Sequence, residues 1–283
     1  MQIFHSAQDL ESPKGFKTAV ANIAIKDDTE DFVCILSNQP CNVAAVFTQS
    51  RFSGASVTIS RAKAANGQAQ AIVAISKNAN VATGQQGEDN ARSIVSAVAK
   101  SIGISEDDVL IASTGVIGRQ YPMQRILPFV ENVGDKFGPA DFVAAARGIM
   151  TTDTIPKYGS VRVGDAVIVG IAKGVGMIEP NMATLLTFFM TDAAIEQPVL
   201  DAIFRRVVNK SFNCLSVDSD TSTSDTAIIL ANGAAGAVDL AQFEAALLEL
   251  AIYLVRTIAR DGEGATKLLQ VNVNGARDDV QAK

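Results

Sequence analysis

The chain has 283 residues, of which 48 % are hydrophobic and 19 % are charged, so a large buried core is expected and wholesale disorder is excluded. The formal net charge is -6 at a sequence pI of about 4.9, and no cluster of Lys and Arg offsets it, which makes nucleic acid a poor partner. His5 is the only histidine and lies in a polar stretch, which excludes Ser-His-Asp and Cys-His catalysis and zinc clusters.

The cysteines and the N-terminal stretch indicate the compartment. Cys34, Cys41 and Cys214 are too few and too scattered for a disulfide framework, so they are interpreted as free thiols in a reducing environment. The stretch "MQIFHSAQDLESPKGF" lacks the positive start and apolar run of a secretory signal. No apolar run approaches the roughly 20 residues that span a bilayer. We therefore expect a cytoplasmic protein with no membrane association.

The first predicted elements are a strand, a helix and a second strand. "AIVAIS" (71–76) and "DVLIAST" (108–114) have the composition of buried strands. Between them, residues 88–103 carry apolar side chains at helical spacing, and Gly103 is well placed to end the helix. A helix-like stretch follows at 142–150, after the loop 134–141, which is the best candidate for a flexible joint.

The second half of the chain continues this alternation. "VRVGDAVIVGIA" (161–172) is predicted to form two strands joined by a tight turn at Gly164-Asp165, and "LLTFFM" (185–190) a further strand. A long helix is predicted from a cap at Asp239 to a stop at Gly262. Its core-facing stripe consists of Phe243, Leu247, Leu250, Leu254 and Ile258. The predicted class is α/β or α+β with mixed sheets.

Three segments match the beginning of a known ligand-binding motif but lack other residues that the motif requires. "DSDTSTSD" (218–225) starts like a calcium loop but lacks its glycine and its final glutamate. "GEGATK" (262–267) has the wrong spacing for a phosphate loop, and "GVG" (174–176) lacks the third glycine of a dinucleotide fingerprint. Each is interpreted as a turn or a cap.

The remaining candidates for a functional site are threonines at the ends of apolar segments, where side chains are held firmly. Thr114-Gly115 closes "LIAST", Thr151 and Thr152 follow the stretch 142–150, and Thr184 precedes the apolar run 185–190. Threonine is also common in strands, so position alone leaves a purely structural role open.

Thr184 has a chemistry that needs no histidine. Gly174 and Gly176 allow a strained backbone just before it, in which its hydroxyl attacks the carbonyl of Ala183. An N-to-O acyl shift and ester hydrolysis would release Thr184 as a new N-terminus. A free α-amine, with a reference pKa of about 7.7–8.0, suits a general base near neutral pH. A threonine with its own amine can therefore perform acyl transfer.

Five segments in order resemble the ornithine acetyltransferase (glutamate N-acetyltransferase) family. They are "STGVIGRQYPM", "IMTTDTIPK", "KGVGMIEPNMATLLTFFMTDA", "DTSTSDTAIILANG" and "DGEGATK", and the likeness extends to about residue 280. The stretches "RFSGASV" and "NANVATG" are similar to the form encoded in clavulanic acid clusters. Members of the family continue beyond "GARDDVQAK" with a segment that includes a "DPNWGR"-type motif, which has no counterpart here.

The resemblance implies a fold and a processing event. The fold has stacked mixed sheets flanked by helices, as in DmpA and the N-terminal nucleophile hydrolases. Autocleavage between Ala183 and Thr184 gives an α-chain region (1–183) and a β-chain region (184–283) that stay associated in one integrated fold and form a homo-oligomer. Thr184 is then the nucleophile, and Thr114 with Gly115 forms the oxyanion hole. Substrate-binding positions are Thr151, Lys173, Thr184 and Glu263.

The implied reaction is acetyl transfer from N2-acetyl-L-ornithine to L-glutamate, by a ping-pong route through acetyl-threonine, as a step of arginine biosynthesis. No acetyl-CoA, metal or organic cofactor is required. By charge, Lys173 would pair with a substrate carboxylate and Glu263 with an amine.

Two alternatives stay open at this point. A threonine-dependent amidase or aminopeptidase keeps the nucleophile but uses water as the acceptor. A non-catalytic, truncated fragment keeps only the fold and associates with a partner.

Overall fold

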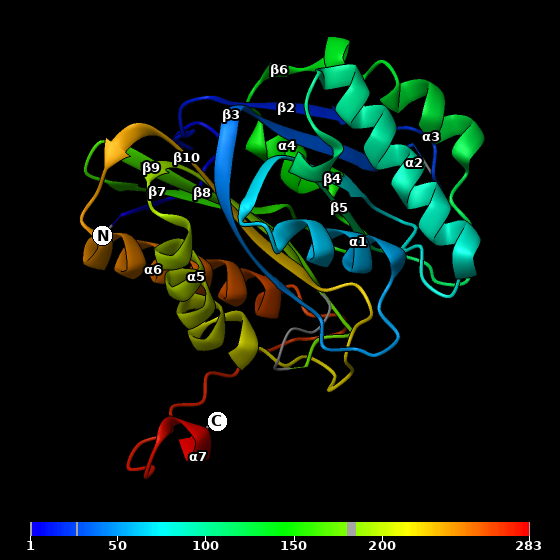
Figure 1. Ribbon diagram of the computed structural model, residues 1–283. Helices are drawn as coiled ribbons and strands as arrows, with labels where there is room; N and C mark the ends of the chain where they lie inside the picture. Colours follow the sequence, from blue (N-terminus) through cyan, green and yellow to red (C-terminus); the bar gives the residue numbers. More distant parts are fainter. Residues whose placement is uncertain (1, 27, 180–184, 283) are drawn as a thin grey trace.

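In the computed structural model, two halves of one mixed ten-stranded sheet lie stacked, and helices cover their outer faces (Figure 1). The structure describes residues 2–26, 28–179 and 185–282. The first half contains β2 (Phe16–Ala21), β3 (Phe32–Phe47), β4 (Gln68–Ile75), β5 (Val109–Ser113) and β6 (Gly138–Pro139). The second contains β1 (Ile3–Phe4), β7 (Lys157–Val163), β8 (Ala166–Lys173), β9 (Leu186–Ala194) and β10 (Thr226–Ala237).

The long strand β3 joins the two halves. Its residues 32–37 pair antiparallel with β2, and its residues 42–47 pair antiparallel with β10. Its register against β4 shifts between Leu36 and Cys41, a bulge that bends the strand. One continuous sheet is therefore divided into two layers whose inner faces share a hydrophobic cluster.

The helices complete a four-layer arrangement. On the first half lie α1 (Ala55–Ala64), α2 (Gly84–Ile102) and α3 (Met123–Val130), and on the second lie α5 (Gln197–Lys210) and α6 (Leu240–Arg260). The short α4 (Phe142–Gly148) packs into the inner cluster. Short 3₁₀ turns occur at Glu106–Asp108, Val133–Lys136 and Phe212–Cys214. Stacked mixed sheets flanked by helices are the class that the sequence predicted.

Strand β9 shows why the apolar run at 185–190 is so continuous. Leu186, Phe188 and Met190 face the inner cluster, whereas Phe189 and Ala193 face α5 and α6. A strand buried on both faces needs apolar side chains at successive positions rather than at alternate ones.

Several predicted elements are confirmed with small changes of boundary. Strands β4 and β5 pair in parallel across α2, and β7 and β8 form the hairpin with its turn at Gly164 (φ +59°). The predicted stripe of α6 is fully buried, and Asp239 Oδ1 accepts from the Gln242 N–H at 2.8 Å as the helix cap.

The two predictions about chain breaks had different outcomes. Helix α6 ends at Arg260 with Asp261 as its C-cap residue, whose backbone N–H bonds back to the last turn, so Gly262 lies directly after the helix where the stop was predicted. The loop 134–141 is not a flexible joint, because part of it is a 3₁₀ turn and β6 within it pairs with β2. Backbone pairing of this kind involves too few residues to leave a sequence pattern.

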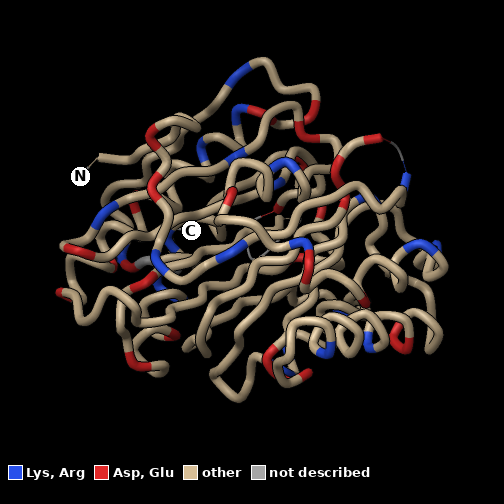
Figure 2. The backbone as a smooth tube through the Cα atoms, turned by 90° about the horizontal axis from the view of Figure 1, so that it is seen from above, with Lys and Arg blue, Asp and Glu red and all other residues tan. Residues whose placement is uncertain are grey.

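The chain after α6 lies outside the sheet and helix layers. Residues 261–278 contain no helix or strand and lead to α7 (Asp279–Ala282), which Figure 1 shows away from the body of the molecule. Positive and negative residues are interspersed along the chain in Figure 2. Within the described ranges, no helix combines the length and the apolar character that a membrane span requires.

Candidate active site

The ends of four strands from both halves of the sheet meet at one place. Lys173, the last residue of β8, lies opposite Leu186, the first residue of β9, and Leu186 lies beside Thr226, the first residue of β10. From the other half, Thr114 directly follows β5, and its Oγ1 accepts a hydrogen bond from Lys173 Nζ at 3.2 Å. Residues from rigid strands of both layers are thus held in contact.

Thr114 and Gly115 present two adjacent hydrogen-bond donors. Thr114 is buried, and Gly115 has φ +128°. A Cβ at Gly115 would lie 2.2 Å from the carbonyl carbon of Lys77, so only glycine fits. Among the described residues, neither the Gly115 N–H nor the Thr114 hydroxyl proton has an acceptor. Two such donors side by side are the requirement of an oxyanion hole.

A buried ion cluster is hydrogen-bonded to the backbone next to Lys173. Lys157 is fully buried, and its Nζ lies 2.6 Å from Asp153 Oδ1 and 2.6 Å from Asp261 Oδ2. Asp153 also accepts hydrogen bonds from Gly174 N at 2.8 Å and from Thr151 N at 3.1 Å. Burial alone would raise the pKa of Asp153, but the charges of Lys173 and Lys157 and these bonds hold it below its usual value.

Lys173 is a second buried cation, and two carboxyl groups act on its charge. It is 3 % exposed, and burial lowers the pKa of its ammonium group. Asp153 and Asp225 act in the opposite direction, whereas Lys157 adds to the lowering. The charge on Lys173 therefore depends on these carboxylates.

The loop that resembles a calcium site holds the chain on both sides of the predicted cleavage segment. Asp218 accepts from the backbone N–H groups of Met177 and Ile178, and Asp225 Oδ1 accepts from Leu185 N at 2.8 Å. Ala183 and Thr184 themselves lie outside the described residues. The acidic ends of "DSDTSTSD" are thus anchors for backbone N–H groups.

Asp225 has an unusual environment for a carboxyl group. It is fully buried, and burial raises its pKa to about 7, although the Leu185 N–H, the Ser222 hydroxyl and the Lys173 charge act to lower it. Its Oδ2 is buried, and no described group lies in hydrogen-bonding geometry with it.

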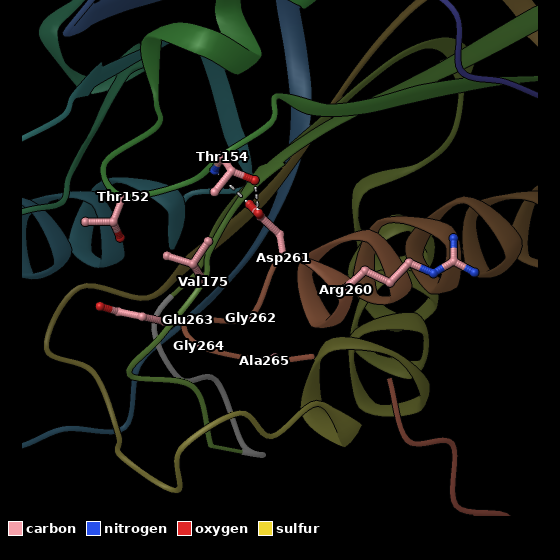
Figure 3. Close-up of a pocket in the computed structure, with 9 residues that line it drawn as sticks. All are labelled: Thr152, Thr154, Val175, Arg260, Asp261, Gly262, Glu263, Gly264 and Ala265. Carbon is pink, nitrogen blue, oxygen red and sulfur yellow. Dashed lines mark hydrogen bonds between the residues drawn. The ribbon is translucent and has the colours of Figure 1, made fainter. Parts of the chain in front are cut away.

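A cavity of about 400 Å³ opens beside these groups (Figure 3). Its lining comes from residues 152 and 154, Val175 and residues 260–265. Glu263 N donates to Val175 O at 2.7 Å, which fixes the loop after α6 against the chain that leaves β8. The Glu263 side chain is exposed at the cavity, on the same side as Thr152, whereas Arg260 points away. Thr114 and Lys173 do not line this cavity.

The predicted site residues are therefore brought together to different degrees. Thr114, Gly115 and Lys173 are in direct contact or adjacent in the chain, Thr151 is linked to them through Asp153, and Glu263 lies at the neighbouring cavity. The sequence reasoning missed the buried charges, which are Asp153, Lys157, Asp225 and Asp261. For Asp153 and Lys157, the sequence signal that could have predicted their pairing is their four-residue spacing within "TTDTIPK". In the described part of the chain, no group of three or more His, Cys, Asp or Glu residues is arranged to hold a metal ion.

Comparison with known sequences shows strong similarity along nearly the whole chain. The profile of the ArgJ family matches residues 17–283. The arginine biosynthesis bifunctional protein ArgJ 2 of Nostoc sp. is 57 % identical over 96 % of this chain and 70 % of its own length. The glutamate N-acetyltransferase Oat2 of Streptomyces clavuligerus is 54 % identical over the same shares, 96 % and 70 %.

Solved structures agree with these sequence matches. The ornithine acetyltransferase of Mycobacterium tuberculosis, solved with ornithine, is 28 % identical with a TM-score of 0.57, over 64 % of this chain and 98 % of that one. A β-aminopeptidase from Burkholderia sp. has a TM-score of 0.53 at 11 % identity, over 92 % of this chain and 87 % of that one, which shows a likeness of fold alone. The profile match and the identities above one half lead to one conclusion: the chain belongs to the ArgJ family.

Proposed function

We propose that this chain is a glutamate N-acetyltransferase, which moves an acetyl group from N2-acetyl-L-ornithine to L-glutamate through an ester on Thr184. The observation that carries the proposal is the pair of donors at Thr114 and Gly115, which lies beside Lys173 at the start of β9. Thr184 immediately precedes Leu185, so its backbone is bonded to a residue that Asp225 holds in place.

Autocleavage is the first step of the proposed mechanism. The Thr184 hydroxyl attacks the carbonyl carbon of Ala183, and the peptide C–N bond breaks as the acyl group moves from nitrogen to oxygen. Water then hydrolyses the ester, which leaves a carboxylate on Ala183 and a free amine on Thr184. Residues 1–183 and 184–283 stay associated, because β8 pairs with β9 and β3 pairs with β10, and each pairing joins a strand of one region to a strand of the other.

Acetyl transfer then proceeds in two balanced half-reactions. The Thr184 oxygen attacks the acetyl carbonyl, its proton passes to the α-amine, and ornithine leaves with that proton on its N2 nitrogen. The α-amine of glutamate attacks the resulting ester, and N-acetylglutamate leaves as the Thr184 hydroxyl re-forms. In both steps the negative charge on the carbonyl oxygen develops toward the Thr114 hydroxyl and the Gly115 N–H.

Thr151, Lys173 and Glu263 are assigned to substrate binding in this proposal. Glu263 is the exposed carboxylate at the cavity and suits the substrate amine. Thr151 is held by the bond of its N–H to Asp153. The substrates are small molecules, and we place the enzyme in the cytoplasm as a homo-oligomer of cleaved chains.

The test is a transfer assay with acetylornithine labelled in its acetyl group. We expect the label to appear in acetylglutamate only when glutamate is present, and to be found on the Thr184 fragment when glutamate is left out. Release of free acetate in place of acetylglutamate would identify a hydrolase and overturn the proposal. Absence of any turnover by cleaved, folded protein would favour the non-catalytic alternative.

A further inference from the structure

Lys173 makes a contact that substrate binding does not explain. Its Nζ donates to Thr114 Oγ1 at 3.2 Å, and the residue is 3 % exposed, at the end of β8. A lysine ammonium has three donors and no acceptor, so in this contact the threonine oxygen must accept. The Thr114 proton is consequently directed away from Lys173, and no described residue takes it.

The charge on Lys173 strengthens this donor. A cation that donates to a hydroxyl oxygen polarises the O–H bond, and the hydroxyl becomes a better donor to a third group. The Thr114 hydroxyl is one half of the proposed oxyanion hole. A charged Lys173 would thus improve the stabilisation of the oxyanion without touching the substrate.

Asp153 is placed to keep Lys173 charged. Its Oδ1 accepts from Gly174 N at 2.8 Å, immediately next to Lys173, and from Lys157 Nζ at 2.6 Å. These bonds fix the carboxylate close to the buried ammonium. The charged groups that act on Lys173 are Asp153 and Asp225, which favour its protonated form, and Lys157, which opposes it together with burial.

We propose that Lys173, held in its charged form by Asp153, is a positioning residue that directs and strengthens the Thr114 hydroxyl as a donor to the oxyanion. This inference rests on the proposed acetyltransferase function and gives Lys173 a role different from pairing with a substrate carboxylate. Asp153 becomes a second positioning residue, which acts through Lys173.

The first experiment measures kcat for acetyl transfer against pH in the wild type and in Asp153→Asn. The active form has a protonated Lys173, so activity falls as pH rises through the pKa of Lys173. Loss of the Asp153 charge lowers that pKa, and the basic limb moves to lower pH by about one unit or more. The acid limb of the profile, which reports the α-amine of Thr184, stays in place. The KM for acetylornithine stays within about twofold of the wild type, because Asp153 does not contact the substrate in this proposal. A lost substrate contact of about 1.4 kcal/mol would raise the KM about tenfold.

Asp261→Asn is the matched control. Asp261 is also 2.6 Å from Lys157 Nζ, so its loss disturbs the same ion cluster, but it does not act on the pKa of Lys173. Its basic limb should coincide with that of the wild type. If Asp153→Asn fails to fold, Asp225→Asn replaces it, because Asp225 also favours charged Lys173. Equal shifts in Asp153→Asn and Asp261→Asn, or no shift in either, would overturn the proposal.

A double-mutant cycle separates the two roles of Lys173. If Lys173 acts through Thr114, then Lys173→Met costs much less in a Thr114→Val background than in the wild type. If Lys173 pairs with the substrate carboxylate, the two losses in kcat/KM multiply and KM rises in both backgrounds. The second result would overturn the proposal while leaving the acetyltransferase function intact.

One readout does not depend on activity. The Lys173 ammonium is titrated by NMR in lysine-labelled protein without substrate, in the wild type and in Asp153→Asn. A lower pKa in the variant supports the inference even if the wild type transfers no acetyl group, a result that would reject only the proposed function. An unchanged pKa rejects the inference whatever the activity.

Discussion

Asp225 holds the start of β9 through a hydrogen bond of 2.8 Å between its Oδ1 and the backbone nitrogen of Leu185. The next residue along the chain, Thr226, donates its N–H to Leu185 O at 3.0 Å. Leu185 is therefore fixed at both its amide nitrogen and its carbonyl oxygen. Since Thr184 is bonded to Leu185, this anchor defines where the predicted nucleophile is attached to the sheet.

We expect Asp225→Leu to slow autocleavage more strongly than Asp225→Asn. Asparagine keeps an oxygen that accepts from Leu185 N, whereas leucine leaves that buried N–H unpaired, which costs about 1–3 kcal/mol. The cleaved fraction is followed by gel electrophoresis after synthesis in a cell-free system. Equal rates in the two variants would show that the hydrogen bond does not position the cleavage segment.

Asp225 also makes stability depend on pH. Its ordinary pKa is 3.8, and in the folded chain it is raised to about 7. Between these values the folded protein holds a proton that the unfolded chain has lost, so the stabilisation is complete below about pH 4 and is lost as pH rises through 7. In a Thr184→Ala background, which keeps one chain, Asp225→Asn should flatten the decline. Urea unfolding at pH 5 and pH 8 measures the free energy of unfolding in both proteins. An equal fall between the two pH values in the variant and its parent would contradict the raised pKa of Asp225.

Thr114 is expected to matter for chemistry more than for binding. Thr114→Val removes one oxyanion donor and should lower kcat by about 10²–10³, with little change in KM. Thr114→Ser keeps the hydroxyl and is the matched control. Initial rates at varied acetylornithine concentration separate the two parameters, and a rise in KM alone would assign Thr114 to substrate binding.

Gly115 and Gly118 offer a comparison between steric clash and backbone strain. Both have positive φ, but a Cβ at Gly115 would lie 2.2 Å from the Lys77 carbonyl carbon, whereas nothing lies within 4 Å at Gly118. Gly118→Ala should cost only about 1–2 kcal/mol of strain. Gly115→Ala must displace the Lys77 backbone, and we expect a larger loss of stability together with loss of transfer activity. Thermal unfolding of the two variants tests this, and equal melting temperatures would argue against the close approach.

The buried cation Lys157 should be a major determinant of stability. Its removal in Lys157→Met leaves Asp153 and Asp261 without their shared partner, and breaking a buried pair in this way costs about 3–5 kcal/mol. Arg206→Gln breaks an exposed pair with Glu244 and should leave the unfolding midpoint nearly unchanged. Similar losses in both variants would mean that the Lys157 cluster is not desolvated.

Much of the fold follows from local sequence patterns. The period of the apolar stripe in α6 and the turn at Gly164 are visible in the chain because they depend on neighbouring residues. The family was identified from its motifs, and the comparisons confirm it. The motifs also indicated Thr114 and Lys173, which the fold brings within hydrogen-bonding distance although they are 59 residues apart.

The buried charges could not be predicted in the same way. In the sequence, an aspartate that pairs with a buried lysine cannot be told from an aspartate that is exposed to water. Asp261, one partner of Lys157, is 104 residues away from it along the chain. The acidic loop 218–225 begins like a calcium site in its sequence, but its carboxylates accept from backbone N–H groups across the chain. Tertiary packing decides which groups become such partners, and a pattern of neighbouring residues does not predict it.

An intact mass spectrum tests most directly whether Thr184 is the nucleophile of a self-cleaving acetyltransferase. Purified wild-type protein should give two chains, the second beginning at Thr184, and Thr184→Ser should also be cleaved because it keeps a hydroxyl. Thr184→Ala should remain a single chain of 29.7 kDa. A single uncleaved chain in folded wild-type protein, or cleavage that persists in Thr184→Ala, would contradict the account.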